Sequence, residues 1–416
     1  MVTGYGSPKK VLAKQEIKDV LAKGLPADIL TDKRVLVLTP DTTRTCPLPL
    51  MIKALARIVA PHAAKLDFMV ALGTHPPMDS NDILTLYGLT PETKAQLLPD
   101  SRLLNHRWDL PDTLKVIGRL DADEVAEISG GVFHQGVDVS INGRIFDYDL
   151  ILILGPVFPH EVAGFSGGDK YLFPGIAGGK FLHFTHWLGA VVTNWDTIGI
   201  KFTPVREALT RAAKLVPVPR ICISMVVRSK SELAGLYVGD TLESWSAAAG
   251  LSEQIHIVYK DKPFHTVLGT ASPMYDELWV AGKVMYKLEP VVAEGGSLII
   301  YGKHIRHVSR TWGDQIARVG YHTRDYFLTR MERFEDIPGG VLAHSTHVRG
   351  LGKYENGVEN PRIKLFLATS ISKRECNAIN LEYIDPDTIN PDDYKNREKD
   401  GILLVEHAGE ILHRLR

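Results

Sequence analysis

The unbroken apolar run LILILGPV, residues 150–157, constrains the fold more than any other stretch of the chain. Such a run is typical of a strand buried on both faces, as in a parallel sheet covered by helices. Two imidazoles, an amine and two glycine clusters follow it, in the order His160, Gly164–Gly168, Lys170, Gly175–Gly179 and His186. Because glycine lets a ligand approach the backbone closely, we expect a binding site directly after this strand.

Three common sites with a similar composition are excluded by their spacing. A phosphate-binding loop of the form G-x-x-x-x-G-K-[ST] fails at Lys170, which stands between Asp169 and Tyr171, and at Lys180, where the spacing is short and Phe181 replaces the Ser or Thr. The glycines do not provide the G-x-G-x-x-G phase of a dinucleotide-binding fingerprint. The His-Glu pair at 160–161 does not continue to the H-E-x-x-H of zinc proteases, because Gly164 stands in the fifth position.

Length and composition indicate a two-domain cytoplasmic enzyme. The 416 residues are enough for two cores, and the 48 basic and 49 acidic side chains nearly balance. This balance argues against a nucleic acid or an anionic membrane as a partner. No apolar run approaches the roughly 20 residues of a membrane span, and three scattered cysteines form no disulfide framework.

The order of strands and helices predicts the α/β class. We expect two α/β domains with mostly parallel sheets and the active site in the cleft between them. The first domain would cover residues 1–265 and bind the cofactor, and the second would cover residues 266–400. The segment 401–416 is expected to pack back on the first domain.

Polar residues follow two further predicted strands. Residues 34–38 precede Asp41-Thr42-Thr43-Arg44, and residues 66–72 precede His75. In open α/β sheets ligands bind at the carboxyl ends of strands, so both loops are candidate sites. Hydroxyls and N–H groups ahead of the helix predicted at 47–59 can hold an anion, and Arg44 can bind a phosphate or carboxylate with two hydrogen bonds. Helix capping explains the Thr and Asp residues as well, and a loop histidine is often only solvated, so the residues alone leave both interpretations open.

The remainder of the chain gives a coarser prediction. Asn142-Gly143 indicates a tight hairpin within residues 138–146, and we assign His106 as a surface or packing residue. In the second domain the pattern predicts, in order, a helix at 274–292 that contains Lys283, a strand at 297–301, a long helix at 312–334, strands at 341–343 and 365–369, and a donor-rich polar loop at 344–350.

Five elements, in this order, resemble the nickel-dependent lactate racemases and their 2-hydroxy-acid relatives. They are Asp41-Thr42-Thr43-Arg44, Gly73-Thr74-His75, His160, the stretch Gly164-Phe165-Ser166-Gly167-Gly168-Asp169-Lys170 with Pro174-Gly175, and His186. The resemblance extends along nearly the whole chain and is loose in the C-terminal third.

The resemblance implies a racemase or epimerase that inverts carbon 2 of a small 2-hydroxy acid. It implies a nickel-pincer nucleotide, the Ni(II)-pyridinium-3,5-bisthiocarboxylate mononucleotide, attached covalently through Lys170, and cofactor-biosynthesis enzymes as partners. The family's roles fall on these positions: cofactor binding on Asp41, Thr42, Thr43, Arg44 and Lys170, nickel binding on His186, acid–base catalysis on His75 and His160, and substrate binding on Arg44 and Lys283.

The chemistry of these residue types is compatible with the implied roles. Carbon 2 beside a carboxylate is a poor acid, so its hydrogen leaves more easily as hydride, which no side chain can accept and a cofactor must. Each enantiomer then needs its own general base, and an imidazole with an unperturbed pKa of about 6.5 suits that role. Imidazole and sulfur donors in a square plane suit Ni(II).

One departure from the family concerns the substrate. Val280 stands where the lactate enzymes carry a glutamine that faces the substrate, so we expect a 2-hydroxy acid other than lactate. Its side chain would be apolar, against Val280, or polyhydroxylated, against the loop 344–349. Trp279 or Trp312 could replace the family's aromatic residue over the cofactor. Two alternatives stay open: an oxidoreductase that uses the same cofactor, and a non-catalytic sensor of sugar acids or nucleotides.

Overall fold

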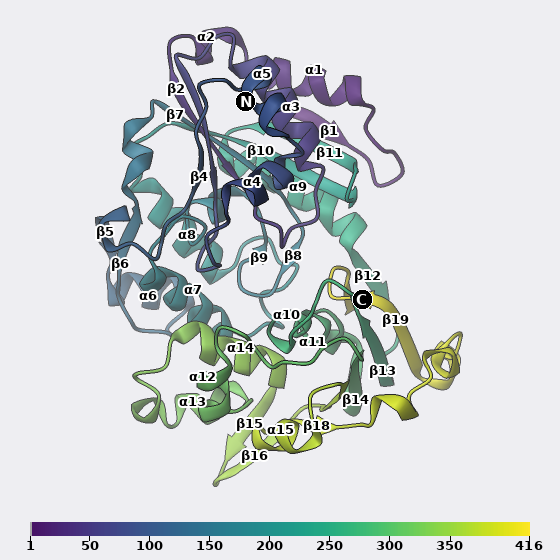
Figure 1. Cartoon of the computed structure of the whole chain (residues 1–416). Coiled ribbons are helices and arrows are strands. Elements are labelled where there is room, and N and C mark those ends of the chain that lie inside the picture. Colours follow the sequence, from purple (N-terminus) through teal and green to yellow (C-terminus); the bar gives the residue numbers. More distant parts are fainter. Residues whose placement is uncertain (1) are drawn as a thin grey trace. The chain divides into compact units, whose positions relative to one another are not determined.

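The computed structural model describes residues 2–416 and divides them into two compact units, each with its own sheet (Figure 1). The first unit runs to Phe158 and adds Phe165–Leu182 and Val205–Ile255. The second unit comprises Pro159–Gly164, His183–Pro204 and His256–Arg416. The predicted α/β class with mostly parallel sheets is confirmed.

A seven-stranded sheet in the order β1-β11-β10-β7-β2-β3-β4 organises the first unit. Neighbouring strands from β10 to β4 are parallel, and β11 joins β10 and β1 by antiparallel pairing. The strands are β1 (Thr3–Gly6), β2 (Arg34–Thr39), β3 (Lys65–Val70), β4 (Leu103–Asn105), β7 (Leu150–Pro156), β10 (Arg220–Ser229) and β11 (Glu232–Gly239).

Helices connect these strands. They are α1 (Lys14–Gly24), α2 (Ala27–Leu30), α3 (Leu48–Val59), α4 (Ser80–Tyr87), α5 (Pro91–Leu97), α6 (Ala122–Ser129), α7 (Gly179–Val192), α8 (Pro204–Lys214) and α9 (Thr241–His256). An antiparallel pair, β5 (Leu114–Leu120) and β6 (Val137–Asn142), flanks α6. Shorter elements are η1 (Pro111–Thr113), η2 (Gly143–Asp147), η3 (Gly168–Tyr171), β8 (Pro159–His160) and β9 (Gly164–Phe165).

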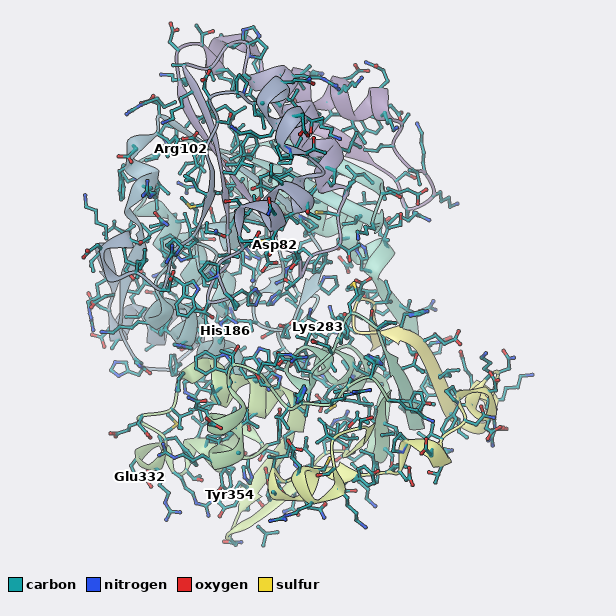
Figure 2. All side chains as sticks on the ribbon, viewed as in Figure 1. Asp82, Arg102, His186, Lys283, Glu332 and Tyr354 are labelled. Atoms are coloured by element: carbon teal, nitrogen blue, oxygen red, sulfur yellow. The ribbon has the colours of Figure 1, made fainter. Side chains whose placement is uncertain are left out.

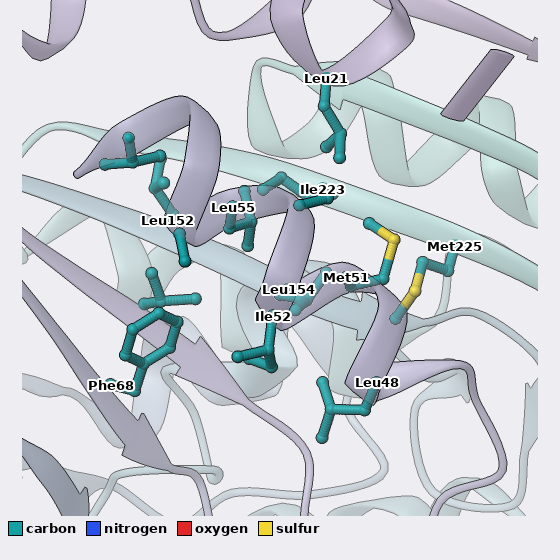
Figure 3. Packing of buried hydrophobic residues seen from close by; sticks show 14 of the residues in the cluster. Leu21, Leu48, Met51, Ile52, Leu55, Phe68, Leu152, Leu154, Ile223 and Met225 are labelled. Atoms are coloured by element: carbon teal, nitrogen blue, oxygen red, sulfur yellow. The ribbon is translucent and has the colours of Figure 1, made fainter. Parts of the chain in front are cut away.

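The core of the first unit explains why β7 is apolar throughout. Every residue of β7 is buried, as expected for a strand with parallel neighbours on both sides. Helix α3 carries apolar residues at spacings of three and four, so that Met51, Ile52 and Leu55 form one packed cluster with Leu152 of β7 (Figure 3). This packing holds the carboxyl end of β7, and the glycine-rich loop after it, in a fixed place.

An all-parallel sheet in the order β18-β17-β14-β13-β19 organises the second unit. Its strands are β13 (Phe264–Ala271), β14 (Val292–Gly302), β17 (Lys364–Thr369), β18 (Glu382–Tyr383) and β19 (Ile402–Ala408). Two smaller pairs are β12 (Ile257–Lys260) with β20 (Leu412–Leu415), and β15 (Gly352–Glu355) with β16 (Val358–Pro361). The helical elements are α10 (Leu278–Ala281), α11 (Lys283–Leu288), η4 (Glu289–Val291), α12 (Gly313–Val319), α13 (Arg324–Leu328), η5 (Met331–Arg333), α14 (Gly339–Arg349), α15 (Lys373–Ala378), η6 (Pro386–Thr388), η7 (Pro391–Tyr394) and η8 (Glu398–Asp400).

The unit boundaries differ from the predicted domain boundaries in two places. Residues 401–416 are assigned to the second unit, where β19 pairs with β13 and β20 pairs with β12; their packing on the first unit stays a prediction. The segment 159–164 also belongs to the second unit, where the buried ammonium group of Lys287 donates a hydrogen bond to the Pro159 carbonyl. His160 and His186, expected in the N-terminal domain, therefore fall in the second unit.

Four local predictions are wrong. Asn142-Gly143 does not form a hairpin, because the Asn142 side chain accepts a hydrogen bond from the Arg144 N–H and caps η2. The long helix expected at 312–334 is interrupted after α12 by Gly320, whose φ is +75°. The expected loop at 344–350 and the expected strand at 341–343 are both part of α14, which is buried along most of its length. Among the described residues no helix is both long and apolar enough to cross a bilayer.

Candidate active site

Three loops of the first unit lie together at the carboxyl ends of β2, β3 and β7. The Gly73 N–H, in the loop after β3, donates to the Gly175 carbonyl in the loop after β7 at 2.9 Å. His75, in the same loop after β3, contacts Asp41 in the loop after β2. The sequence predicted that the residues after these strands would share one edge of the sheet, and the hydrogen bonds connect them at that edge.

The imidazole of His75 is oriented by Asp41. Its Nδ1 lies 2.5 Å from Asp41 Oδ2, and the Trp108 indole N–H donates to the His75 carbonyl at 2.8 Å. Asp41 Oδ1 accepts two hydrogen bonds from Thr43, from the backbone N–H at 3.0 Å and from the hydroxyl at 2.6 Å. The carboxylate is buried, whereas the His75 side chain is 51% exposed. The basic face of His75 therefore stays open to a ligand.

The charge state of Asp41 decides the tautomer of His75. Burial alone would raise the pKa of the Asp41 carboxyl, but the hydrogen bond and charge of His75, the charge of Arg44 and the Thr43 hydroxyl together hold that pKa well below its ordinary value. A carboxylate can only accept a hydrogen bond. Nδ1 of His75 therefore carries a proton and donates a hydrogen bond to Asp41. Nε2 of the neutral ring then carries the lone pair, which is the arrangement a general base needs.

Arg44 and Lys170 bring positive charge to this edge of the first unit. The guanidinium carbon of Arg44 lies 5.7 Å from the centre of the Phe158 ring, and its side chain is partly buried. Lys170 is partly buried in η3. Its neighbour Tyr171 is buried and has its pKa raised well above the ordinary value, chiefly by burial, with Arg44 and Asp41 among the charges acting on it. Thr42 and Thr43 are exposed.

Two glycines are required by the packing of η3 on the sheet. A Cβ atom at Gly155 would lie 2.1 Å from the Tyr171 ring, and one at Gly175 would lie 2.4 Å from the Tyr171 carbonyl oxygen. Both distances are shorter than any real contact, so larger residues would displace the loop that carries Lys170.

A buried arginine supports the same loop and was not predicted from the sequence. Arg206 of α8 donates to the carbonyls of Gly167, at 3.1 Å, and Phe165, and its guanidinium carbon lies 4.2 Å from the centre of the Trp245 ring. Burial lowers the pKa of Arg206 to about 10. An arginine in an amphipathic helix usually lies on the solvent face, so the sequence offered no signal for this role.

His160 lies in the second unit, with surroundings unlike those of His75. It is 5% exposed, and its Nδ1 accepts a hydrogen bond from the Val162 N–H at 3.1 Å. Glu161 Oε2 is 3.6 Å from the same nitrogen. Because the backbone N–H can only donate, Nδ1 is unprotonated in this arrangement and the neutral ring carries its proton on Nε2.

Helix α7 carries two histidines, His183 and His186, both in the second unit. Nδ1 of His183 accepts a hydrogen bond from the Gly340 N–H at 3.3 Å, and its ring meets Trp312 edge to face with ring centres 5.8 Å apart. Burial lowers the pKa of His183. These contacts are those of a packing residue; His186, three residues further along α7, stays the predicted nickel ligand (Figure 2).

Lys283 begins α11, after Gly282 separates it from α10, so the predicted continuous helix at 274–292 is broken at this point. Its ammonium nitrogen lies 5.0 Å from the centre of the Tyr275 ring. One turn earlier, Trp279 is held by His344, whose ring stacks on it at 4.0 Å and whose Nε2 lies 3.0 Å from the Trp279 carbonyl oxygen. Burial lowers the pKa of His344 to about 3, so this histidine is neutral.

The structure therefore separates the candidate residues into two groups. Those of the first unit are Asp41, Thr42, Thr43, Arg44, His75 and Lys170, and those of the second are His160, His186 and Lys283. Contacts at the carboxyl edge of the sheet join His75, Asp41 and Thr43 directly.

Known proteins with similar sequences support one family. Residues 8–197 match the lactate racemase N-terminal domain. The chain is 23% identical over 273 residues to the lactate racemase of Lactiplantibacillus plantarum and 23% identical over 275 residues to that of Thermoanaerobacterium thermosaccharolyticum. Each alignment covers 64% of this chain and spans 59% of the relative's length.

Solved structures extend the similarity to the whole chain. A crystal structure of a Thermotoga maritima protein matches with a TM-score of 0.87 and 30% identity, over 99% of this chain and 100% of that one. The structure of the lactate racemase apoprotein from Thermoanaerobacterium thermosaccharolyticum matches with a TM-score of 0.74 and 17% identity, over 96% of this chain and 92% of that one, and shows a shared fold.

Residues 8–197 belong to the lactate racemase N-terminal domain family. The matched N-terminal domain contains every candidate residue except Lys283, which lies beyond residue 197. The C-terminal third, in which the resemblance by motif is loose, is covered by the structural matches.

The residues of the first unit fit the nucleotide that the lactate racemase family implies. Arg44 supplies positive charge, Lys170 supplies the amine through which the nucleotide would be attached, and the exposed hydroxyls of Thr42 and Thr43 supply hydrogen-bond donors. Between residues 2 and 416 no group of three or more His, Cys, Asp or Glu side chains could hold a metal ion. In the implied cofactor, sulfur and carbon supply the other nickel ligands, and His186 as the protein ligand stays a prediction.

Proposed function

We propose that the chain is a racemase or epimerase that inverts carbon 2 of a 2-hydroxy acid with a nickel-pincer nucleotide attached through Lys170. The Asp41–His75 contact carries the proposal, because it leaves the lone pair of Nε2 available on the sheet edge where the Lys170 loop also lies. A histidine prepared as a base beside the glycine-rich loop that carries the attachment lysine is what hydroxyl deprotonation near a bound nucleotide requires. The match of residues 8–197 to the lactate racemase N-terminal domain supports the same assignment.

The two histidines would exchange protons with the substrate hydroxyl. His75 takes the hydroxyl proton of one enantiomer while carbon 2 loses its hydrogen together with the bonding electron pair, and a planar ketone results. When bound, the nucleotide supplies the group that accepts and returns this hydride. His160 gives a proton to the ketone oxygen when hydrogen returns to the opposite face, and the roles reverse for the other enantiomer.

Arg44 and Lys283 would hold the substrate carboxylate. Arg44 presents a planar fork that can bind a carboxylate through two parallel hydrogen bonds, and Lys283 presents a compact charge at the start of α11. If the carboxylate is held in place while the rest of the ketone can rotate, hydrogen can return to either face of carbon 2. Asp41, Thr42, Thr43 and Arg44 would hold the nucleotide in place, and His186 would bind the nickel.

The substrate side chain is best described as apolar and larger than that of lactate. The polyhydroxylated alternative depended on a donor-rich loop at 344–349, and these residues form part of the buried helix α14. Val280 and the partly exposed Trp279 ring, held by His344, offer an apolar surface in the same part of the second unit. We expect turnover to favour acids with bulky apolar groups over lactate and sugar acids.

The test combines intact mass with stereochemistry. The chain would be produced together with cofactor-synthesis enzymes, and a panel of single enantiomers covering lactate, apolar and polyhydroxylated acids would be followed by chiral chromatography. We expect an added mass on the wild type and none on Lys170→Ala, and scrambling of stereochemistry with constant total hydroxy acid. Lys180→Ala, which changes an exposed lysine ten residues further on, is the matched control and should keep both properties.

Two outcomes would contradict the proposal. Accumulation of a keto acid in proportion to substrate loss would indicate an oxidoreductase with the same cofactor. Ligand binding by a wild-type chain whose mass never changes would indicate a sensor.

A further inference from the structure

Glu161, the residue after His160, places its carboxylate near Nδ1 of the His160 ring. Glu161 Oε2 is 3.6 Å from Nδ1 of His160, too long for a hydrogen bond but within ion-pair range. The side chains of His160 and Glu161 are 6% and 19% exposed. Because both side chains are largely buried, water screens the charge of Glu161 only weakly and the carboxylate acts strongly on the His160 ring.

Nδ1 of His160 therefore has two candidate partners of opposite type. The Val162 N–H, at 3.1 Å, can only donate and needs Nδ1 unprotonated. The Glu161 carboxylate can only accept and needs Nδ1 protonated. Both cannot be satisfied at once, so the protonation of Nδ1 decides which partner the ring uses.

Other titratable groups around this turn come from α11 and α14. The Lys287 ammonium donates a hydrogen bond to the Pro159 carbonyl. The charge of Glu161 affects the pKa values of Tyr286, His344 and His347. Burial lowers the pKa of His347 to about 4 and that of His344 to about 3, and it raises the pKa of Tyr286 well above its ordinary value. These three rings are neutral at physiological pH, so Glu161 and Lys287 are the charges nearest the turn among these groups.

We propose that Glu161 is a positioning residue that competes with the Val162 N–H for Nδ1 of His160 and thereby prepares His160 as the second acid–base group. This inference rests on the proposed function. In the Val162-bonded form the neutral ring carries its proton on Nε2 and has no lone pair there. In the Glu161-bonded form Nδ1 carries a proton, as Nδ1 of His75 does beside Asp41.

The exchange of the Nδ1 partner, from the Val162 N–H to Glu161, adds one proton to the His160 ring. Nδ1 takes one proton from solvent, the Val162 hydrogen bond is lost, and the imidazolium donates its Nδ1 proton in a hydrogen bond to Glu161. Nε2 then gives its own proton to the ketone oxygen of the substrate. The ring is left neutral with its proton on Nδ1 and its lone pair on Nε2, ready to take the hydroxyl proton of the opposite enantiomer.

The exchange can be measured without the cofactor. In protein labelled with ¹⁵N only in histidine, the nitrogen shifts of His160, assigned by their loss in His160→Gln, report which ring nitrogen is protonated at each pH. We expect an unprotonated Nδ1 at high pH and a titration midpoint that falls by about one pH unit in Glu161→Gln, because a nearby negative charge favours the imidazolium. Glu161→Asp should restore most of the midpoint. Glu355→Gln, which removes an exposed charge from the β15–β16 hairpin, should leave it in place.

The loaded enzyme supplies a second readout. The alkaline limb of the pH profile of kcat/KM, which reports loss of the His160 proton, should move to lower pH in Glu161→Gln by the same amount as the NMR midpoint. A structural role of Glu161 would lower activity evenly across pH and leave the limb in place.

The two hypotheses fail in different ways. An unchanged His160 midpoint in Glu161→Gln overturns the role of Glu161, even if the wild type racemises its substrate. A lowered midpoint in a chain that racemises no 2-hydroxy acid supports the coupling of Glu161 to His160 and overturns the proposed function.

Discussion

The two candidate bases are the same residue type in opposite settings. His75 belongs to the first unit, is half exposed, and donates its Nδ1 proton to a buried carboxylate. His160 belongs to the second unit, is almost fully buried, and accepts a backbone hydrogen bond at Nδ1. The neutral rings therefore have opposite tautomers, with the lone pair on Nε2 in His75 and on Nδ1 in His160.

This difference means that matching two histidines to a motif does not make them equivalent. His75 is ready to accept a proton at Nε2, whereas His160 must first change the partner of Nδ1. A racemase needs one proton acceptor and one proton donor in each direction. An unequal pair fits that need, provided that the second ring can change its state during turnover.

The strongest test of the comparison removes each ring in turn. His75→Ala and His160→Ala should each lower interconversion by about 10²–10⁴-fold, the usual cost of a lost general acid or base. Because a racemisation has equal stability on both sides, kcat/KM must fall equally in the two directions. Chiral chromatography of both enantiomers, on enzyme whose cofactor load is checked by intact mass, measures the effect.

A histidine outside the candidate set provides the control. His134 is exposed and paired with Asp123, so His134→Ala should keep the wild-type rate. A near wild-type rate in His75→Ala or His160→Ala would remove that residue from the mechanism and end the comparison.

A smaller effect is expected when His75 keeps its ring and loses its partner. Asp41→Asn replaces an acceptor by a group that can also donate, so the tautomer of His75 is no longer fixed. We expect kcat to fall by about 10- to 100-fold, as for other partners that orient a functional imidazole. If the rate is unchanged, the 2.5 Å contact orients nothing that turnover needs.

The same substitution has a pH signature in stability. The pKa of Asp41 is depressed in the folded chain, so its ionised form stabilises the fold above the unfolded value of about 3.9, and this contribution is lost as pH falls below that value. Wild type should exceed Asp41→Asn in unfolding free energy at pH 7, and the gap should close below about pH 4. Urea unfolding at a series of pH values measures the gap, and a gap that widens toward acid would contradict the sign.

The parts of this fold that could be predicted from the sequence are those fixed by local pattern. Residues 150–156 and 35–38 are apolar because parallel neighbours and helices cover them, and both segments lie in strands. Residues that follow parallel strands must lie at one sheet edge, which is why Asp41 and His75 could be placed together before their contact was known.

Long-range partners explain the main failures. Asn142-Gly143 and Asn356-Gly357 carry the same hairpin signal, and only the second forms the turn, with both residues at positive φ between β15 and β16. The side-chain amide nitrogen of Asn142 instead lies 3.1 Å from Nδ1 of the buried His106. The local sequence pattern does not predict this long-range contact.

The candidate site shows the same limit. His344 was assigned to a polar loop because it stands among donors, yet it stacks on Trp279 inside a buried helix. The support that Arg206 gives to the glycine-rich loop comes from a helix that the sequence describes only as amphipathic. Tertiary packing decides both cases, and a single sequence contains no direct record of it.

The smallest expected effect concerns the two histidines of α7. His183→Gln should keep the nickel content of the loaded enzyme unchanged and destabilise the fold by about 1 kcal/mol, because only the hydrogen bond from Gly340 and the contact with Trp312 are altered. His186→Gln is the matched change three residues on, and it should lose nickel while folding normally. Metal analysis together with thermal unfolding separates the two variants. Should His183→Gln lose the metal and His186→Gln retain it, the ligand assignment would pass to His183, and the contacts with Gly340 and Trp312 would be those that orient a nickel ligand.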